Sequence, residues 1–231
     1  AELLPGVPVD FIDETTGAEV AATVDDLAQG GILLLENLRF AAGEKTNSTD
    51  FAREIVESTG AEIFVQDGFA VTHRAHASTD AITKLLPAVA GLLLEKEVTT
   101  LTKLMQNPDR PLAVMIGGAK VADKQPLIER FSSVADRILV GGKIAADGYA
   151  TDDPKVYVAE DFDEDQAGAK LDIGPFATAK FVDAAKISRT VLWNGVLGRV
   201  EDPAYATAST LLAETLGENS KIESIICGGD T

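Results

Sequence analysis

The segment Pro111-Leu-Ala-Val-Met-Ile116 runs directly into Gly117-Gly-Ala-Lys-Val-Ala-Asp-Lys124. A short apolar run of this kind predicts a buried strand, and the paired glycines predict a tight turn that leaves the backbone open to a ligand. The helix expected after the turn would offer free N–H groups and the positive end of its dipole to an anion. Lys120 and Lys124 are four residues apart and would share one helix face. The segment therefore indicates either a phosphate site or a glycine-terminated strand followed by an ordinary solvated helix.

Apolar runs with the length of a strand alternate along the chain with helical patterns. The expected strands are residues 32–35, 63–65, 112–116, 138–140, 156–158, 190–193 and 222–227. The expected helices between several of them are residues 50–58, 127–135, 177–185 and 204–216. Strands that are apolar on both faces and separated by helices predict a parallel sheet covered on both sides. In such a sheet, ligands bind beyond the carboxyl ends of the strands.

Four of the expected strands end at glycine. The four ends are Gly117-Gly118, Gly141-Gly142, Asn194-Gly195 and Gly228-Gly229. A single glycine end carries little information, but four in one half of the chain suggest that one sheet edge is kept bare for a flat or phosphorylated ligand. The pattern matches neither the GxxxxGK[ST] phosphate loop nor the GxGxxG dinucleotide motif, which disfavours both of those families.

The charge balance is strongly acidic, with 37 Asp and Glu against 20 Lys and Arg and a net charge of −17 in 231 residues. Such a chain repels nucleic acid and anionic membrane surfaces. Because the acids are spread along the chain, we interpret them as the solvated surface of a salt-adapted protein. Cys227 is the only cysteine, so no intrachain disulfide can form. The longest apolar stretch, residues 85–94, is too short to cross a bilayer. We expect a soluble, cytoplasmic protein.

Two arginines of the first half follow expected strands. Arg39 comes just after residues 32–35, and Arg74 lies between His73 and His76, the two histidines of the chain. In so acidic a chain, local positive charge favours an anionic substrate, because arginine matches carboxylate and phosphate geometry. The alternative is that both arginines pair with surface acids. A metal site at the histidines is improbable, because no cysteine or further histidine completes it.

The motifs of the chain resemble those of the 3-phosphoglycerate kinase family, and they occur here in the family's order. They are Glu36-Asn-Leu-Arg-Phe40, Asp67-Gly-Phe-Ala-Val-Thr-His-Arg-Ala-His-Ala-Ser78, Gly117-Gly-Ala-Lys-Val-Ala-Asp-Lys124, Asp172-Ile-Gly-Pro175, Trp193-Asn-Gly195 with Glu201, and Gly228-Gly-Asp-Thr231. The short spacings and the acidic surface look like the version of the enzyme from salt-loving archaea. The resemblance runs from about Gly30 to Thr231.

The resemblance implies an α/β fold with two Rossmann-like three-layer domains, whose parallel sheets are joined by a connecting helix. It assigns residues 1–94 to a partial N-terminal domain on the 3-phosphoglycerate side. Residues 95–110 would form the interdomain helix and hinge, and residues 111–231 a partial C-terminal, nucleotide-binding domain. Both domains are expected to be incomplete in this chain. The family's complete enzyme would be a monomer.

The resemblance also implies a reaction, namely reversible phosphoryl transfer between 1,3-bisphosphoglycerate and ADP, which gives 3-phosphoglycerate and ATP. The reaction would use Mg2+ and would require closure of the hinge. Arg39 and Arg74 would bind the phosphate of the acid substrate, and Lys120 would be catalytic. The nucleotide site would contain Gly118, Ala119, Lys124, Gly142, Gly174, Asn194, Glu201, Gly228, Gly229, Asp230 and Thr231, with Asp230 also holding the metal. Positioning and charge neutralisation are what phosphoryl transfer requires.

The chain departs from the family pattern at several places. The family's opening Asp-Phe-Asn-Val-Pro and His-Leu-Gly-Arg-Pro units have no counterpart, and the chain stops before the family's last glycine-rich phosphate loop. Residues 144–170 are shorter than expected, while Val196 and Val200 replace a usual proline and phenylalanine. We therefore expect the 231-residue chain to be part of a kinase and inactive alone. The alternative is a nucleotide-binding remnant without turnover, whose unpaired sheet edges would favour self-association.

Overall fold

The computed structural model describes residues 4–118, 121–229 and 231, and for residues 121–123 it describes the backbone alone. The chain divides into two compact units, Ala1–Leu101 and Thr102–Thr231. The division falls inside the long helix α4 (Leu92–Gln106). Both units combine helices with parallel strands, which confirms the predicted α/β class. Each unit is described by itself.

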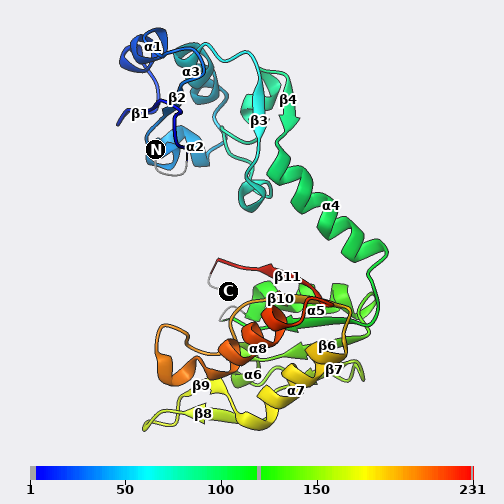
Figure 1. Ribbon diagram of the computed structural model, residues 1–231. Helices are drawn as coiled ribbons and strands as arrows, with labels where there is room; N and C mark the ends of the chain where they lie inside the picture. The colour runs from blue at the N-terminus through cyan, green and yellow to red at the C-terminus, as the bar shows by residue number, and fades with distance from the viewer. Residues whose placement is uncertain (1–3, 119–120, 230) are drawn as a thin grey trace. The chain divides into compact units, whose positions relative to one another are not determined.

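The second unit is built on one parallel sheet of five strands in the order β11-β10-β5-β6-β7 (Figure 1). The strands are β5 (Leu112–Ile116), β6 (Arg137–Val140), β7 (Val156–Val158), β10 (Thr190–Asn194) and β11 (Glu223–Cys227). Every residue of β5 is buried, as expected for the central strand of a sheet covered on both faces. In the register of the sheet, Trp193 lies opposite Met115 on one side and Ile226 on the other.

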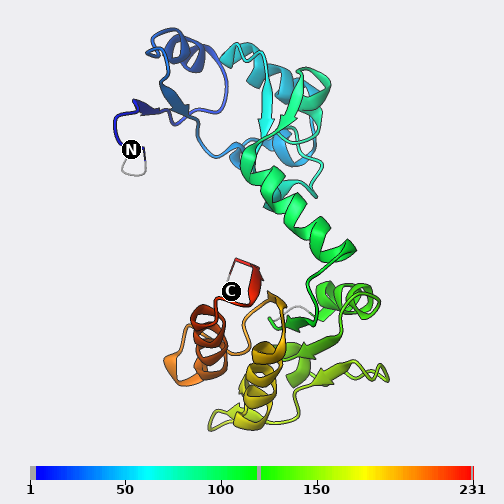
Figure 2. The same cartoon turned by 45° about the vertical axis from the view of Figure 1, so that its right-hand side comes forward.

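Helices α7 (Pro175–Ile187) and α8 (Thr207–Glu218) lie side by side in Figures 1 and 2 and cover one face of this sheet. Phe181 of α7 and Leu212 of α8 pack in one buried cluster with Met115 and Trp193 of the strands. Helix α5 packs against β5 and β6. Further elements of the unit are α5 (Val121–Ser132), α6 (Gly142–Ala146), the antiparallel pair β8 (Phe162–Glu164) and β9 (Lys170–Ile173), α7 (Pro175–Ile187), η4 (Pro203–Tyr205) and α8 (Thr207–Glu218).

The first unit contains two separate parallel strand pairs, β1–β2 and β3–β4. Its elements before α4 are β1 (Val9–Phe11), α1 (Ala18–Asp25), β2 (Ile32–Leu34), η1 (Leu38–Phe40), α2 (Ala42–Lys45), α3 (Thr49–Thr59), β3 (Phe64–Gln66), η2 (Phe69–Val71), η3 (Ala81–Lys84) and β4 (Ala88–Ala90). Helix α3 begins at the Ser48 side chain, which accepts a hydrogen bond from the backbone N–H of Phe51, and ends at Gly60 in the left-handed conformation. Phe51 and Ile55 of α3 form the core with Ile82.

The sequence located the strands of the second unit closely, and the helix before β6 less well. Helix α5 runs from Val121 to Ser132, with Pro126 inside it, whereas the pattern predicted a helix over residues 127–135. Its first part is the helix expected directly after the Gly117-Gly118 turn. The β8–β9 pair was not predicted, since its segment is highly charged. In the part of the chain that the structure describes, no helix is both long and apolar enough to cross a membrane.

Candidate functional site at the carboxyl edge of the second sheet

The strand order of the second unit has one reversal point, between β5 and β10. From β5 the chain passes to β6 on one side, while β10 lies against the other side of β5. In open parallel sheets such a reversal opens a crevice beyond the carboxyl ends of the two strands. Here these ends are Ile116-Gly117 and Asn194-Gly195. The sheet thus places two of the glycine-ended strands at the position where a ligand is expected.

Several predicted nucleotide-site residues meet at this reversal point. The ammonium group of Lys124, on α5, donates a hydrogen bond to the Oδ1 atom of Asn194 at the end of β10. The Thr231 hydroxyl oxygen accepts a hydrogen bond of 2.9 Å from the backbone N–H of Gly195. Gly118 lies beside them with a φ of +90°. The position that a Cβ would take on Gly118 is 3.9 Å from the Cε atom of Lys124. A cation, an amide and a hydroxyl therefore converge beside bare backbone.

The glycines at the strand ends also pack against one another. A Cβ on Gly195 would lie 2.6 Å from the carbonyl carbon of Gly117, and one on Gly142 would lie 2.9 Å from the amide nitrogen of Gly118. Three neighbouring strand ends, those of β5, β6 and β10, thus approach backbone to backbone. Part of the glycine pattern is therefore required by the packing of the protein itself, and only part can be kept for a ligand.

The backbone N–H groups at the same place are already used. Gly117 donates to the Asn194 carbonyl at 3.0 Å, and Gly118 donates to the Val196 carbonyl at 2.8 Å. The N–H of Gly195 donates to Thr231. Phosphate binding by these three amides would require those hydrogen bonds to break. The candidates for contact with an anion at this place are therefore side chains, and Lys124 is the cation among the described ones.

Gly174 lies at another carboxyl end, between β9 and α7. A Cβ there would lie 2.7 Å from the carboxylate carbon of Asp161. That carboxylate accepts hydrogen bonds of 2.8 Å from the N–H groups of Phe176 and Ala177 in the first turn of α7. The positive end of α7 is therefore already neutralised by Asp161. An added phosphate would be repelled there.

Glu201 lies on the exposed loop between β10 and η4. The loop is fixed to β9, because Arg199 N–H donates to the Leu171 carbonyl at 2.8 Å. Among the residues described here, no hydrogen bond joins Gly174 or Glu201 to the cluster around Lys124. Gly228 has a φ of +105°, and the Thr231 hydroxyl lies 2.8 Å from its Cβ position; a Cβ on Gly229 would meet nothing within 4 Å. Ala119, Lys120 and Asp230 lie outside the described residues.

Asp172 holds the Glu201 loop and helix α8 together from inside. Its side chain is buried, with 2% exposure, and its carboxylate accepts hydrogen bonds from the N–H groups of Ala208 at 3.0 Å and Ile173 at 2.9 Å. A Cβ on Gly198 would lie 2.5 Å from the Asp172 carboxylate carbon. Burial raises the pKa of Asp172, and the backbone N–H groups of Ala208 and Ile173 oppose that rise.

In the first unit, Arg39 lies in η1 and Arg74 in the turn after η2, and both side chains are exposed. Neither forms an ion pair with any residue that the structure describes. This disfavours the alternative in which both arginines pair with surface acids. His76 is buried, and its Nδ1 lies 3.5 Å from Glu44 Oε1. The described residues contain no group of three or more His, Cys, Asp or Glu side chains that could hold a metal.

The buried carboxylate of Glu44 connects the segments that carry the two arginines. Glu44 follows η1 in α2 and is 3% exposed. Its carboxylate accepts hydrogen bonds from the Ser78 hydroxyl at 2.6 Å and the Ser78 N–H at 3.0 Å. Its carbonyl accepts from the Ala77 N–H at 3.0 Å. The turn with Arg74 is therefore fixed against the helix that follows Arg39.

Comparison with known proteins accounts for this set of motifs. The sequence profile of the family described as phosphoglycerate kinase matches residues 1–156 and 146–231. The chain belongs to the phosphoglycerate kinase family. The two matches overlap between residues 146 and 156, within the stretch predicted to be short.

Individual phosphoglycerate kinases are similar over all of this chain. It is 31% identical to the phosphoglycerate kinase of Dictyoglomus turgidum and 35% identical to that of Geotalea daltonii, in alignments that cover 100% of this chain and 69% of each relative. These alignments extend over 278 and 279 positions, so the relatives carry internal segments that the 231 residues lack. The chain spans about two thirds of the length of the phosphoglycerate kinases it matches.

Solved structures of the family have the same fold. The phosphoglycerate kinase of Pyrococcus horikoshii superimposes with a TM-score of 0.81 at 22% identity, over 92% of this chain and 66% of that one. The enzyme from Coxiella burnetii gives a TM-score of 0.67 at 28% identity, over 96% of this chain and 66% of that one. The fold predicted from the motifs is thereby confirmed.

Three buried or capping acids were missed by the sequence interpretation. The sequence places Asp161 among the spread acids interpreted as solvated surface, and it places Asp172 in a motif without a structural role. It gives Glu44 no role. Only Glu44 could have been recognised from its neighbouring sequence, because it follows Arg39 in a short helical segment. The partners of these acids lie 15 to 36 residues away along the chain, so the sequence pattern alone could not identify them.

A groove of about 840 Å³ lies between α7 and α8. Thr178 and Val182 of α7 and Leu211 and Thr215 of α8 line it. None of the predicted site residues is among its described lining.

Proposed function

We propose that this chain contributes to phosphoryl transfer between 1,3-bisphosphoglycerate and ADP, which gives 3-phosphoglycerate and ATP. The observation that carries the proposal is the meeting of Lys124 with Asn194, beside Gly118 and Thr231, at the reversal point of a parallel sheet. Membership of the phosphoglycerate kinase family supports it. The proposal makes the chain a phosphotransferase component whose nucleotide side is residues 111–231.

Lys124 is the described residue best suited to the nucleotide phosphates. Its ammonium group already contacts the amide oxygen of Asn194, which orients it toward the bare backbone of Gly118. An ammonium group held in this way offsets the negative charge of a polyphosphate without any change in the fold. Since Asp161 already neutralises the start of α7, we expect the phosphates at Lys124 and the ribose or base toward Gly174 and Glu201.

A magnesium ion fits this arrangement if it arrives with the nucleotide. Mg2+ usually takes one or two protein carboxylates together with substrate phosphates and water. We assign the carboxylate to Asp230, by the family motif, with the Thr231 hydroxyl beside it. When bound, the ion would neutralise charge on the phosphates. Lys120 is proposed as the catalytic cation, and Gly142, Gly228, Gly229 and Ala119 as backbone of the nucleotide pocket.

For the first unit we propose that residues 1–94 serve the acid substrate, with Arg39 and Arg74 binding its phosphate. Both guanidinium groups are exposed and free of ion pairs among the described residues, and Glu44 fixes the segments that carry them. Residues 95–110 are proposed as the connecting helix and hinge. The net charge of −17 favours a salt-adapted protein that binds neither nucleic acid nor membranes. By family resemblance we propose that the complete protein is a cytoplasmic monomer.

Calorimetric titration of the chain with MgADP tests the nucleotide site. We expect measurable binding, and we expect Lys124→Met to weaken it about tenfold, the usual effect of losing one charge-assisted hydrogen bond. The matched control is Lys180→Met, which removes an exposed lysine of α7 outside the site. Absence of heat at millimolar MgADP, or equal losses in both variants, would refute the proposed site.

A second candidate is a nucleotide-binding protein without turnover. It is favoured by the first unit, whose strands form two separate pairs, whereas the second unit has one continuous sheet. A coupled assay of ADP release that depends on ATP and 3-phosphoglycerate separates the two functions. We expect the isolated chain to bind MgADP and to show no turnover. Clear turnover would exclude the second candidate.

A further inference from the structure

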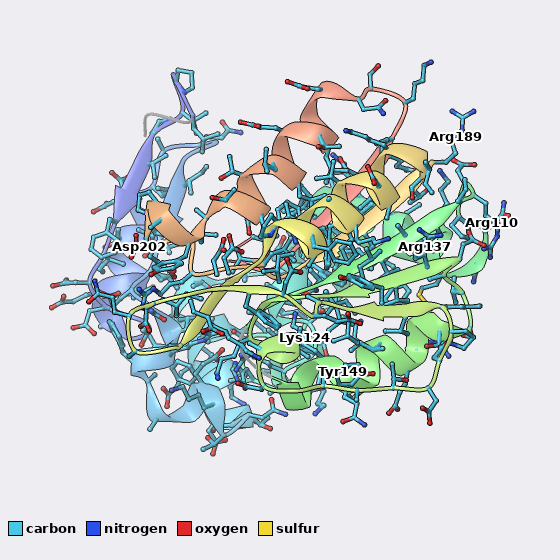
Figure 3. All side chains as sticks on the ribbon, turned by 90° about the horizontal axis from the view of Figure 1, so that it is seen from below. Arg110, Lys124, Arg137, Tyr149, Arg189 and Asp202 are labelled. Atoms are coloured by element: carbon cyan, nitrogen blue, oxygen red, sulfur yellow. The ribbon has the colours of Figure 1, made fainter. Side chains whose placement is uncertain are left out.

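A polar pocket of about 430 Å³ lies at the amino edge of the second unit's sheet. Its walls include Arg110 before β5, Arg189 before β10, and Lys221 before β11, together with the acids Asp109 and Glu223. Figure 3 shows Arg110 and Arg189 on the same side of the unit, away from Lys124. Three cations around one pocket are unusual in a chain with a net charge of −17.

We call this pocket, which is lined by Arg110, Arg189 and Lys221, the basic pocket. Its two acids, Asp109 and Glu223, are already paired. Lys103 of α4 lies 3.2 Å from Asp109 Oδ2 and 3.0 Å from Glu223 Oε2. The hydrogen bond to Glu223, followed by that to Asp109, raises the pKa of Lys103, so this ammonium group stays charged. A single lysine thus offsets much of the negative charge that would otherwise repel an anion from the pocket.

The cations of the basic pocket differ in what they already bind. Arg110 contacts the Asp136 carboxylate and donates a hydrogen bond of 3.0 Å to the Val134 carbonyl, so its charge is balanced. The side chains of Arg189 and Lys221 are exposed and make no hydrogen bond or ion pair with any residue the structure describes. With Lys103 and Asp136 included, four cations face three carboxylates, so one net positive charge remains at the pocket. Arg189 and Lys221 are the two cations there that no described residue binds.

The backbone holds Arg189 and Lys221 in place. The Arg189 N–H donates to the Pro111 carbonyl at 2.9 Å, and its carbonyl accepts from the Glu223 N–H at 2.8 Å. The Lys221 N–H donates to Asn219 Oδ1 at 3.1 Å. Both residues are therefore anchored at the starts of neighbouring strands, and only side-chain freedom is lost when they bind a common ligand.

We propose that the basic pocket binds a phosphate group through Arg189 and Lys221. A guanidinium group matches two phosphate oxygens at once, and an ammonium group adds a third charge-assisted hydrogen bond. The pocket is distinct from the proposed nucleotide site, because Arg189 precedes β10 whereas Asn194 ends it. Five residues of strand separate the two sites by about 17 Å.

Nuclear magnetic resonance titration with inorganic pyrophosphate, at constant ionic strength set with KCl, tests the proposal. We expect saturable shifts of the Arg189, Lys221 and Ile222 amides, separate from any shifts near Gly118 and Asn194. The double variant Arg189→Gln/Lys221→Gln should weaken the first set at least about tenfold and leave the second unchanged. If the proposed nucleotide site does not exist, only the shifts near Gly118 and Asn194 will be missing. The experiment therefore tests the two proposals independently.

The matched control is Lys180→Gln/Lys186→Gln, which removes two exposed charges from α7. It should leave the shifts at the basic pocket unchanged. Equal weakening in both double variants would show a general charge effect and overturn the proposal. Absence of saturable shifts at Arg189 and Lys221 up to about 10 mM pyrophosphate, a dissociation constant that corresponds to only about 3 kcal/mol of binding free energy, would overturn it as well.

Discussion

Glycines at the strand ends of the second unit are packing residues, because the backbones there approach one another too closely for a Cβ. Gly195 has a φ of +94°, and a Cβ there would lie 2.6 Å from the Gly117 carbonyl carbon and 2.9 Å from the Gly118 amide nitrogen. Its carbonyl accepts a hydrogen bond of 2.8 Å from the indole N–H of Trp193. The same residue therefore joins β5, β10 and the core of the unit.

We expect Gly195→Ala to destabilise the second unit by about 3 kcal/mol, from a strained backbone and a clash with backbone atoms that cannot move aside. Trp193, the only tryptophan of the chain and 2% exposed, reports unfolding of this unit by fluorescence in urea. The control is Gly217→Ala in α8, where a Cβ would meet nothing within 4 Å. This control should leave the free energy of unfolding unchanged or raise it by up to about 1 kcal/mol. An unchanged midpoint for Gly195→Ala would contradict this account.

At the scale of elements, helix starts are set by acids that come from distant parts of the chain. Asp161 caps α7, and Asp172 reaches the first turn of α8. Asp67 does the same for α4, where its carboxylate accepts hydrogen bonds from Leu93 at 2.8 Å and Leu94 at 3.0 Å. The loops that approach the strand ends are thereby tied to the helices behind them.

The buried position of Asp172 predicts a pH dependence of stability. Its pKa is raised above the usual 3.8 by burial. Between 3.8 and the raised value, the folded state holds a proton that the unfolded state has lost, so this carboxyl contributes less stability as the pH rises. Asp172→Asn lacks that titration. We expect wild type to lose stability relative to Asp172→Asn as the pH is raised from about 4 to 7, measured by Trp193 fluorescence in urea.

Asp165 provides a comparison of opposite sign. The N–H groups of Ala169 and Ala167 lower the pKa of this exposed carboxyl in the β8–β9 turn. Its contribution is present above the usual pKa of 3.8 and is lost as the pH falls below it. The free energy of unfolding of wild type should therefore increase relative to that of Asp165→Asn as the pH rises. If both variants showed the same sign of pH dependence, the assignment of Asp172 would be wrong.

The sequence predicts elements well where burial is uniform and poorly where it is not. Strand β5 has the predicted bounds because it is apolar on both faces. The β8–β9 pair escaped prediction because Phe162–Glu164 is mostly charged, and because the Asp165 carboxylate that holds the turn accepts hydrogen bonds from the turn's own Ala167 and Ala169 N–H groups. For the site, the meeting of Lys124 and Asn194 follows from parallel strand ends. The capping role of Asp161 depends on folding and has no local signal.

At the scale of the whole molecule, charge repulsion is the dominant electrostatic feature. The chain carries an excess of 17 negative charges, whereas the described ion pairs are mostly between exposed side chains. Exposed pairs contribute about 0–1 kcal/mol each and are screened by salt. Repulsion between excess charges is screened as well, and this screening favours the folded state. The two effects of salt oppose each other, and the excess of like charge decides the sign.

We therefore expect the stability of the chain to rise with KCl concentration. Unfolding midpoints followed by circular dichroism and by Trp193 fluorescence should increase steeply up to about 1 M KCl, where the screening length falls to roughly 3 Å, and more slowly above it. Sucrose at equal osmolality is the control, because it strengthens burial by exclusion without screening charge. A midpoint that does not change with KCl, or that rises equally in sucrose, would contradict the salt-adapted interpretation. The acids would then serve mainly as local caps, as Asp161 and Asp172 do.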